Sequence, residues 1–235
     1  MSGFADVVGE RGPGVVADGD GAAAVAAWLV GDLPTALVTE LFDTLDAEER
    51  RRAACLSSPE ARDRFVIAHG AMRRIVADHL GAPPVALAWR TGPHGKPELT
   101  GPWTGVHANL SHSGGSCLIA LSAARDVGAD IQHLVPGLDV CAMSRRYFAS
   151  LEAEAVAADP EPAAAFAQLW ARKEAVTKAA GGRLTQVLPL PAHDVVEVSA
   201  SAYRVADIEV PDGFRAAIAL AGRAPFSVEV REWQP

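Results

Sequence analysis

The order of the predicted elements places this chain in the α+β class. Helical patterns precede strand-like runs along the sequence, and the same order occurs again in the second half. Strict alternation of strands and helices would instead predict a parallel sheet built from βαβ units. We therefore divide the chain into a loosely ordered tail over residues 1–21, a first half over residues 22–125 and a second half over residues 126–235.

The first half opens with residues 22–33, a run whose pattern fits a strand and a short helix equally well. Helices are predicted from about Ala36, after the N-cap Asp46, and over residues 59–80. The third of these is long and carries an apolar stripe that a core would bury. Strands are then predicted at residues 85–90, 105–115 and 117–123.

The second half begins with a predicted strand at residues 127–132. Helices are predicted over residues 144–158 and 162–180, and a pair of glycines ends the second one. Four further strands alternate with turns in the last third, at residues 194–199, 202–210, 214–221 and 226–233.

The composition is that of a globular protein with an acidic balance. Hydrophobic residues make up 49% of the chain and charged residues 21%, which is enough apolar material for a packed core. The 21 basic and 29 acidic residues leave a net charge of −8. That balance argues against a surface that binds nucleic acid or anionic lipid, but it does not exclude a local basic pocket.

The sequence carries no export or membrane signal. No run approaches the ~20 apolar residues that span a bilayer, and the N-terminus lacks the apolar region of a secretory signal. The 3 cysteines show no metal-binding spacing and predict free thiols in a reducing compartment. We expect a soluble cytoplasmic protein.

Asp130 and Gln132 lie two residues apart on the predicted strand 127–132, so their side chains project from the same face. A carboxylate beside an amide oxygen can hold a hard cation such as Mg²⁺. Taken alone, however, such a pair is more often the polar, solvent-facing end of a strand.

Trp170, Glu174 and Lys178 are spaced by four and lie along one face of the predicted helix 162–180. A solvent-exposed Glu–Lys pair at this spacing is worth only ~0.3–0.5 kcal/mol. The functional alternative makes the glutamate a metal ligand or base and the lysine a phosphate-binding cation. The neighbouring tryptophan and alanines favour a packed helix, which leaves both alternatives open.

Three further segments contain groups that bind phosphate. Residues 109–115 (NLSHSGG) offer hydroxyls and backbone N–H groups in a glycine turn, without the elements of a hydrolase triad. Residues 94–97 (HGKP) form a stiffened loop with a lysine. Arginines concentrate over residues 50–74; most would be solvated, and a few could hold a terminal phosphate.

In this order, the basic helix, GKP, NLSHS, GADIQ and WxxKEAxxK resemble the 4′-phosphopantetheinyl transferases of the surfactin-synthetase type. The resemblance covers Leu45–Gly182, with a continuation through residues 214–221. Most of its specificity comes from WxxKEAxxK at residues 170–178 together with G-x-D at residues 128–130. It implies two halves related by a pseudo-twofold axis, each a small antiparallel sheet with a long helix, and an active-site cleft between them.

The resemblance also implies an activity. Such an enzyme moves 4′-phosphopantetheine from coenzyme A to a serine of an apo acyl or peptidyl carrier protein and releases adenosine 3′,5′-bisphosphate. Asp130 and Glu174 match the metal-binding carboxylates, and Gln132 stands where the family usually has glutamate. The metal is Mg²⁺, with Mn²⁺ as the alternative. Glu174 and Lys178 are the implied catalytic residues, and the serine proton goes to Glu174 or to a metal-bound water.

A further set of residues matches the coenzyme A contacts of the family: Arg64, His69, His94, Gly95, Lys96, Pro97, Ser111, His112 and Lys178. His69 stands where many relatives have arginine, for which Arg64, with Arg52, could compensate at the 3′-phosphate. We expect a monomer that serves polyketide or nonribosomal-peptide synthesis of the antibiotic type, with no nucleic-acid or membrane partner. An acidic carrier would need a local docking patch, for which residues 145–148 are candidates.

Two alternatives from other classes remain. One is a coenzyme A-binding module that has lost catalysis, against which the intact Asp130, Glu174 and Lys178 argue. The other is an unrelated Mg²⁺-dependent phosphohydrolase, against which the lack of a larger carboxylate cluster argues.

Overall fold

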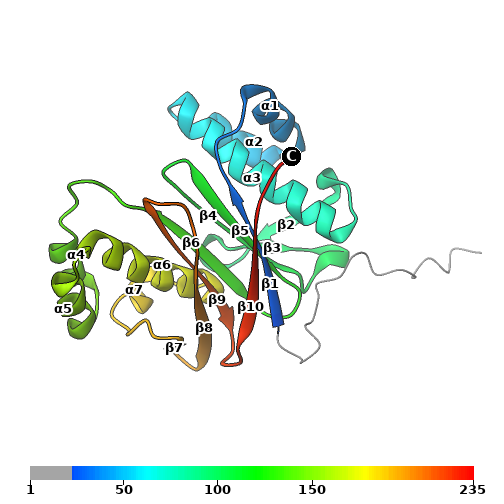
Figure 1. Ribbon diagram of the computed structural model, residues 1–235. Helices are drawn as coiled ribbons and strands as arrows, with labels where there is room; N and C mark the ends of the chain where they lie inside the picture. The colour runs from blue at the N-terminus through cyan, green and yellow to red at the C-terminus, as the bar shows by residue number, and fades with distance from the viewer. Residues whose placement is uncertain (1–22) are drawn as a thin grey trace, which may run out of the picture.

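The computed structural model describes residues 23–235, and the expected tail over residues 1–21 lies outside them. Within this range the α+β class is confirmed: each of two four-stranded sheets packs against a long helix (Figure 1). The first sheet has the strand order β10 (Phe226–Glu232), β1 (Ala23–Val30), β5 (Ser116–Ser122), β4 (His107–Ser113). The second sheet has the order β6 (Val127–His133), β9 (Phe214–Ala221), β8 (Ser201–Ile208), β7 (Val195–Val198).

Helices α1 (Thr35–Thr44), α2 (Ala47–Ala54) and α3 (Pro59–Leu80) gather on the first sheet, at the top of Figure 1. The Asp46 side chain accepts a bond from the Glu49 N–H, and the Glu49 side chain accepts one from the Asp46 N–H, so the predicted cap of α2 is a capping box. Gly81 ends α3 in the left-handed conformation, as predicted. Helix α3 buries its apolar stripe against the sheet in one large core cluster.

The segment between α3 and β4 differs from the prediction. The expected strand at residues 85–90 consists of a 3₁₀ turn, η1 (Pro84–Ala86), followed by the short strand β2 (Trp89–Thr91). Two consecutive prolines at its start supply no N–H donor and favour the turn. Strand β2 pairs with β3 (Pro97–Leu99), and this hairpin carries the turn η2 (Pro93–Gly95) before η3 (Gly101–Trp103).

The second half contains α4 (Val140–Tyr147), α5 (Ser150–Ala158), α6 (Pro162–Ala180) and α7 (Leu184–Val187). The long helix α6 has the predicted bounds, and Gly181 caps it. The single helix expected over residues 144–158 is instead two helices. The chain breaks at Phe148, whose backbone is extended and whose ring is buried in a stack with Phe166, with centroids 5.2 Å apart.

The last strand crosses from the second half to the first. β10 pairs in parallel with β1, from Ala23 opposite Phe226 to Leu29 opposite Glu232. The division of the chain at residues 125 and 126 stays a prediction, and β10 is the segment that reaches across it. β1 itself settles the open choice at residues 22–33 in favour of a strand.

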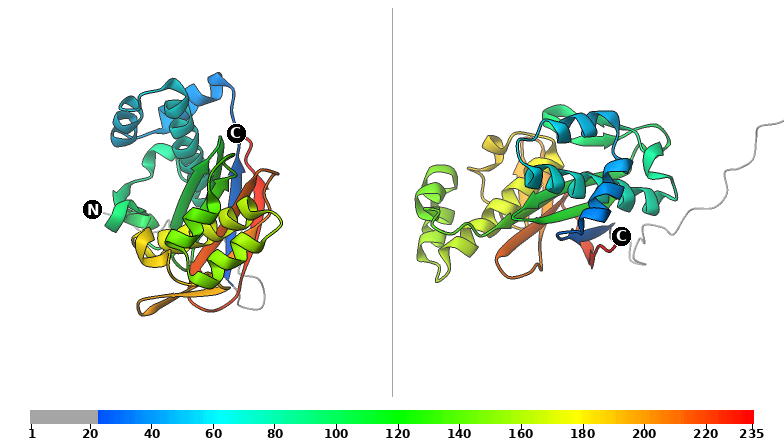
Figure 2. Two further views of the ribbon diagram at one scale, coloured as in Figure 1. Left: turned by 90° about the vertical axis from the view of Figure 1, so that its left-hand side faces the viewer. Right: turned by 90° about the horizontal axis from the view of Figure 1, so that it is seen from above.

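The two sheets meet along β4 and β6, which make many close contacts. Figure 2 shows the green strands of this part of the chain between the cyan helices of the first half and the yellow-green helices of the second. Side chains rather than a backbone ladder join them: the Ala129 N–H donates to Asn109 Oδ1 (2.9 Å), and the His133 N–H donates to Ser113 Oγ (3.0 Å). A core cluster of apolar residues from β1, β5, β6 and β9 unites the sheets. No helix within residues 23–235 is long and apolar enough to cross a membrane.

Candidate active site

The Asp130 carboxylate is the centre of the site, in the seam formed by β4, β6 and α6. Its residue is 1% exposed. Oδ1 accepts a hydrogen bond from Ser111 Oγ of β4 (2.7 Å) and contacts Lys178 Nζ of α6 (2.5 Å). Oδ2 accepts one from Gln132 Nε2 (2.6 Å), so the predicted shared face of the β6 pair is present.

Gly128 explains why α6 lies so close to this carboxylate. A Cβ atom at residue 128 would lie 2.0 Å from the Ala175 carbonyl oxygen and 2.4 Å from the Ala179 nitrogen. Only glycine allows this approach, because any other residue would push the helix off the strand. This role of Gly128 was not predicted, although a glycine inside a strand pattern is itself a signal of close backbone approach.

Glu174 is the second carboxylate of the site. Trp170 Nε1 donates to Glu174 Oε1 (3.2 Å), and Glu174 Oε2 lies 3.9 Å from Lys178 Nζ. Burial and the nearby Asp130 charge raise the pKa of Glu174 above its usual 4.5, and Lys178 and Trp170 offset only part of this. One ammonium therefore serves two carboxylates, and the site keeps an excess of negative charge.

The excess of negative charge makes a divalent cation a candidate ligand of the site. Within residues 23–235 no cluster of three or more histidine, cysteine, aspartate or glutamate side chains forms a metal site. The donor set is thus two carboxylates and the Gln132 amide, which suits Mg²⁺ because this ion binds one or two carboxylates and keeps several waters. Burial and the Asp130 charge both disfavour the charged form of Glu174, and a further positive charge would offset them. The residues fit such an ion.

The loop at residues 94–97 forms one wall of a pocket beside the carboxylates. All four loop residues and Lys178 line this pocket of about 250 Å³, together with Asn109 and residues at the C-terminal end of α6. His94 adopts a left-handed conformation with φ 57°. Lys96 turns its ammonium away to Asp126 Oδ1 (2.6 Å) and to the Ala179 carbonyl (3.0 Å).

Two further pockets hold the predicted contacts Arg64, His69 and His112. His69 lines one of them with Gly95 and Pro97; its ring stacks on Phe65, with centroids 4.0 Å apart. Arg64 and His112 line the other, beside the glycine turn at residues 114–115. Desolvation and the nearby basic groups His69, Lys178 and Arg64 lower the pKa of His112, against the opposing effect of Asp130. Basic side chains therefore gather on this side of the seam.

Comparison with known proteins supports an assignment. Residues 126–223 match the model of the 4′-phosphopantetheinyl transferase superfamily. The 4′-phosphopantetheinyl transferase HetI of Nostoc sp. is 29% identical over 213 residues, which cover 87% of this chain and 86% of HetI. The chain is therefore similar to 4′-phosphopantetheinyl transferases, over residues 126–223 by the family model and over most of its length by HetI.

Two further relatives agree. A putative 4′-phosphopantetheinyl transferase of Synechocystis sp., slr0495, is 34% identical over 156 residues, 62% of each chain. The 4′-phosphopantetheinyl transferase AcpT of Salmonella typhi is 37% identical over 99 residues, 41% of this chain and 51% of AcpT. The protein is thus a transferase enzyme, similar to proteins that are named as 4′-phosphopantetheinyl transferases.

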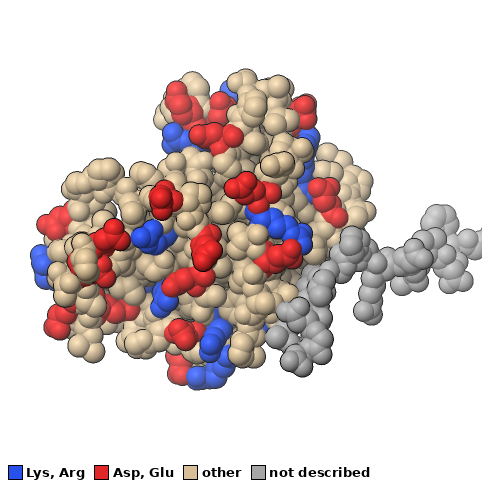
Figure 3. Space-filling view, in the orientation of Figure 1, with Lys and Arg blue, Asp and Glu red and all other residues tan. Residues whose placement is uncertain are grey.

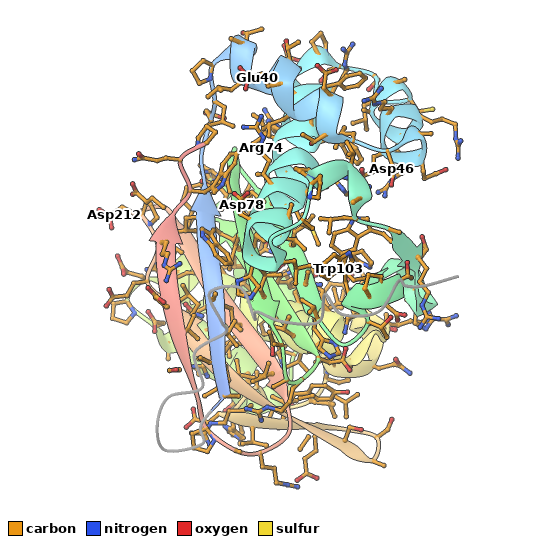
Figure 4. All side chains as sticks on the ribbon, turned by 90° about the vertical axis from the view of Figure 1, so that its right-hand side faces the viewer. Glu40, Asp46, Arg74, Asp78, Trp103 and Asp212 are labelled. Atoms are coloured by element: carbon orange, nitrogen blue, oxygen red, sulfur yellow. The ribbon has the colours of Figure 1, made fainter. Side chains whose placement is uncertain are left out.

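Most arginines of the predicted basic segment of the transferase serve its fold. Arg73 is 1% exposed and binds Asp46 and Glu49, and Arg74 contacts Glu40 (3.3 Å; Figure 4). Arg64 is exposed and has no ion pair within residues 23–235. Figure 3 shows acidic and basic side chains interspersed over one face, without a surface of single sign. Arg64 therefore remains available to an anionic ligand beside His112.

Proposed function

We propose that the transferase moves 4′-phosphopantetheine from coenzyme A to a serine of an apo acyl or peptidyl carrier and releases adenosine 3′,5′-bisphosphate. The observation that carries this proposal is the convergence of Asp130, Glu174 and Lys178 beside the pocket walled by residues 94–97. The carrier is one of polyketide or nonribosomal-peptide synthesis, and the transferase works as a cytoplasmic monomer.

The reaction exchanges one phosphorus–oxygen bond for another. The serine oxygen forms a bond to the β-phosphorus of coenzyme A, and the bond from that phosphorus to the bridging oxygen breaks. The electron pair leaves with adenosine 3′,5′-bisphosphate. Catalysis then rests on in-line positioning and on neutralising the charge that the leaving group gains.

Each residue of the site has a part in this chemistry. Lys178 lines the pocket with a side chain 25% exposed, so its ammonium can bind the pyrophosphate. Ser111 and Trp170 fix the orientation of Asp130 and Glu174 through their hydrogen bonds. The serine proton leaves toward Glu174, to its carboxylate or to a water beside it.

Asp130 and Glu174 would hold Mg²⁺, or Mn²⁺ as the alternative, with the Gln132 amide oxygen as a third donor. When bound, such an ion polarises the β-phosphorus and neutralises charge on the pyrophosphate. Arg64, His69 and His112 line the neighbouring pockets and are the proposed contacts of the 3′-phosphate end.

Glu174→Ala tests the proposal. We expect transfer to fall by about two orders of magnitude or more, because a group that stabilises transition-state charge is lost. The fold should remain, since Glu174 is partly exposed and leaves no buried partner charge unpaired. The measurement is the mass of an intact apo carrier after incubation with coenzyme A and Mg²⁺.

Glu154→Ala, an exposed glutamate of α5, is the matched control and should turn over like the wild type. Equal turnover of Glu174→Ala and the control would contradict the assignment. In the same assay, coenzyme A that stays bound and unchanged would indicate a binding module. Hydrolysis without a carrier would indicate a phosphohydrolase.

A further inference from the structure

Lys96 takes a different position from the one expected of a phosphate contact. Its side chain is 10% exposed. Its ammonium lies between the β2–β3 hairpin of the first half and the start of β6 and the end of α6 in the second half. We propose that Asp126 is a positioning residue: through Lys96 it holds the loop of residues 92–97 against α6 and so sets the affinity for coenzyme A. We call the contacts of Lys96 with Asp126 and with the end of α6 the latch. This inference rests on the proposed function.

Asp126 joins three segments at the start of β6. Its Oδ1 atom contacts Lys96 Nζ of the loop (2.6 Å) and His107 Nδ1 of β4 (3.1 Å). The hydrogen bonds from His107 and Lys96 outweigh burial and hold the pKa of Asp126 well below its usual range. The carboxylate therefore stays charged, and it faces Lys96 at any pH near neutrality.

The end of α6 is the second acceptor of the latch. Lys96 Nζ donates to the Ala179 carbonyl (3.0 Å), where the last carbonyls of a helix carry partial negative charge. The stem of Lys96 lies beside Gly181, which caps the helix. An ammonium held by two acceptors and largely removed from water would lose both bonds if it turned to a phosphate.

The latch also fixes the loop relative to the reacting groups. Ala179 follows Lys178 directly, so the loop is tied one residue from the cation that lines the pocket. Gly95 and Pro97 line two neighbouring pockets, and a displaced loop would open a wall of both. Loss of the latch should thus weaken coenzyme A binding and leave the chemical step nearly intact.

Asp126→Asn, Lys96→Met and the double variant separate the two roles of Lys96. Each single variant should raise the KM for coenzyme A up to about tenfold, as for a broken ion pair whose lysine is buried and whose aspartate is half exposed, with kcat within about twofold of the wild type. The double variant should be no worse than either single one, because all three remove the same contact. Lys96→Arg should restore most of the affinity.

A direct phosphate contact predicts another pattern. Asp126→Asn would then leave the KM unchanged or lower it, while Lys96→Met alone would raise it, and this result would overturn the proposal. The matched control is Glu197→Gln. Glu197 lies on β7, at the far edge of the second sheet, and the change removes its exposed ion pair with Arg223. Its KM should equal that of the wild type.

Amide hydrogen exchange supplies a readout independent of turnover. Residues 92–97 should exchange faster in Asp126→Asn and Lys96→Met than in the wild type and the control. If Asp126→Asn does not fold, unchanged exchange in Lys96→Met alone refutes the latch. A wild type that binds coenzyme A by calorimetry but does not modify a carrier would refute the proposed function instead.

Discussion

Asp130 shows how one buried carboxylate organises the site at the scale of single residues. Donors from β4, β6 and α6 all reach its two oxygens. The Gln132 amide fills, with a hydrogen bond, the place where the family usually has a third carboxylate. A neutral group there leaves the site with fewer negative charges for a cation, and the requirement for Mg²⁺ should reflect this.

Gln132→Glu is therefore expected to lower the Mg²⁺ concentration for half-maximal transfer. Without metal the variant should be less stable, because a carboxylate would replace the amide 2.6 Å from Asp130 Oδ2. Thermal unfolding with and without Mg²⁺ measures this second effect apart from activity. A Mg²⁺ dependence equal to that of the wild type would show that residue 132 is remote from the ion.

Gln168→Glu is the matched control for this substitution. Gln168 Nε2 also donates to an aspartate, Asp207 (2.8 Å), but on the surface between α6 and β8. The change should cost some stability there without altering the Mg²⁺ requirement.

Sequence spacing predicted which residues share a face, but not which atoms meet. The i, i+2 pair on β6 and the i, i+4 series on α6 follow from element geometry alone. The bonds of Ser111 and Lys178 to Asp130 span 19 and 48 residues, and such separations depend on the fold of the whole chain. The pairing of Lys96 with Asp126 could not be predicted from the sequence for the same reason.

At the scale of elements, the contact of β6 with α6 is what brings the charged groups together. Gly128→Ala should destabilise the transferase by about 1–3 kcal/mol or more, because the added methyl group meets the helix backbone. It should also reduce transfer, since the helix that carries Glu174 and Lys178 would shift. Thermal unfolding and the carrier mass assay measure the two effects.

Gly31→Ala is the control, because no atom lies within 4 Å of the added Cβ and its backbone needs no glycine. We expect its stability to stay within about 0.5 kcal/mol of the wild type. Equal stability of the two variants would show that the helix and strand can separate without cost.

Local signals were reliable where caps mark an element. The bounds of α2, α3 and α6 follow from Asp46, Pro59 and Gly181. Local signals failed where burial decides: the break at Phe148 exists because its ring packs on Phe166, and no nearby glycine or proline announces it. The pairing partner of β10 was likewise invisible, since a strand pattern does not name its neighbour.

At the scale of the whole molecule, an acidic protein has to receive a polyanionic substrate and a carrier. Ion pairs inside the fold use many of the arginines, and the exposed Arg64 has none within residues 23–235. Arg145 and Arg146 are exposed in the last turn of α4, and Tyr147 contacts Trp170 next to Glu174. Phe148 is buried and takes no part in that surface.

The double change Arg145→Glu and Arg146→Glu should raise the KM for an acidic carrier about tenfold or more and leave the KM for coenzyme A unchanged. The effect should shrink as salt screens the charges. The pair Arg223→Glu and Arg231→Glu makes the same change in net charge on exposed strand and turn positions elsewhere. Equal carrier KM values for the two double variants would rule out a docking role for α4.

The parallel pairing of β10 with β1 has a consequence for the order of events in folding. β1 is among the first segments of the described chain to be synthesised, and its partner at residues 226–232 among the last. Contacts so distant in sequence demand a large loop-closure entropy and slow the search for the native state. Until β10 is synthesised, β1 is an unpaired edge of the first sheet. Chaperones or neighbouring chains can bind at that edge.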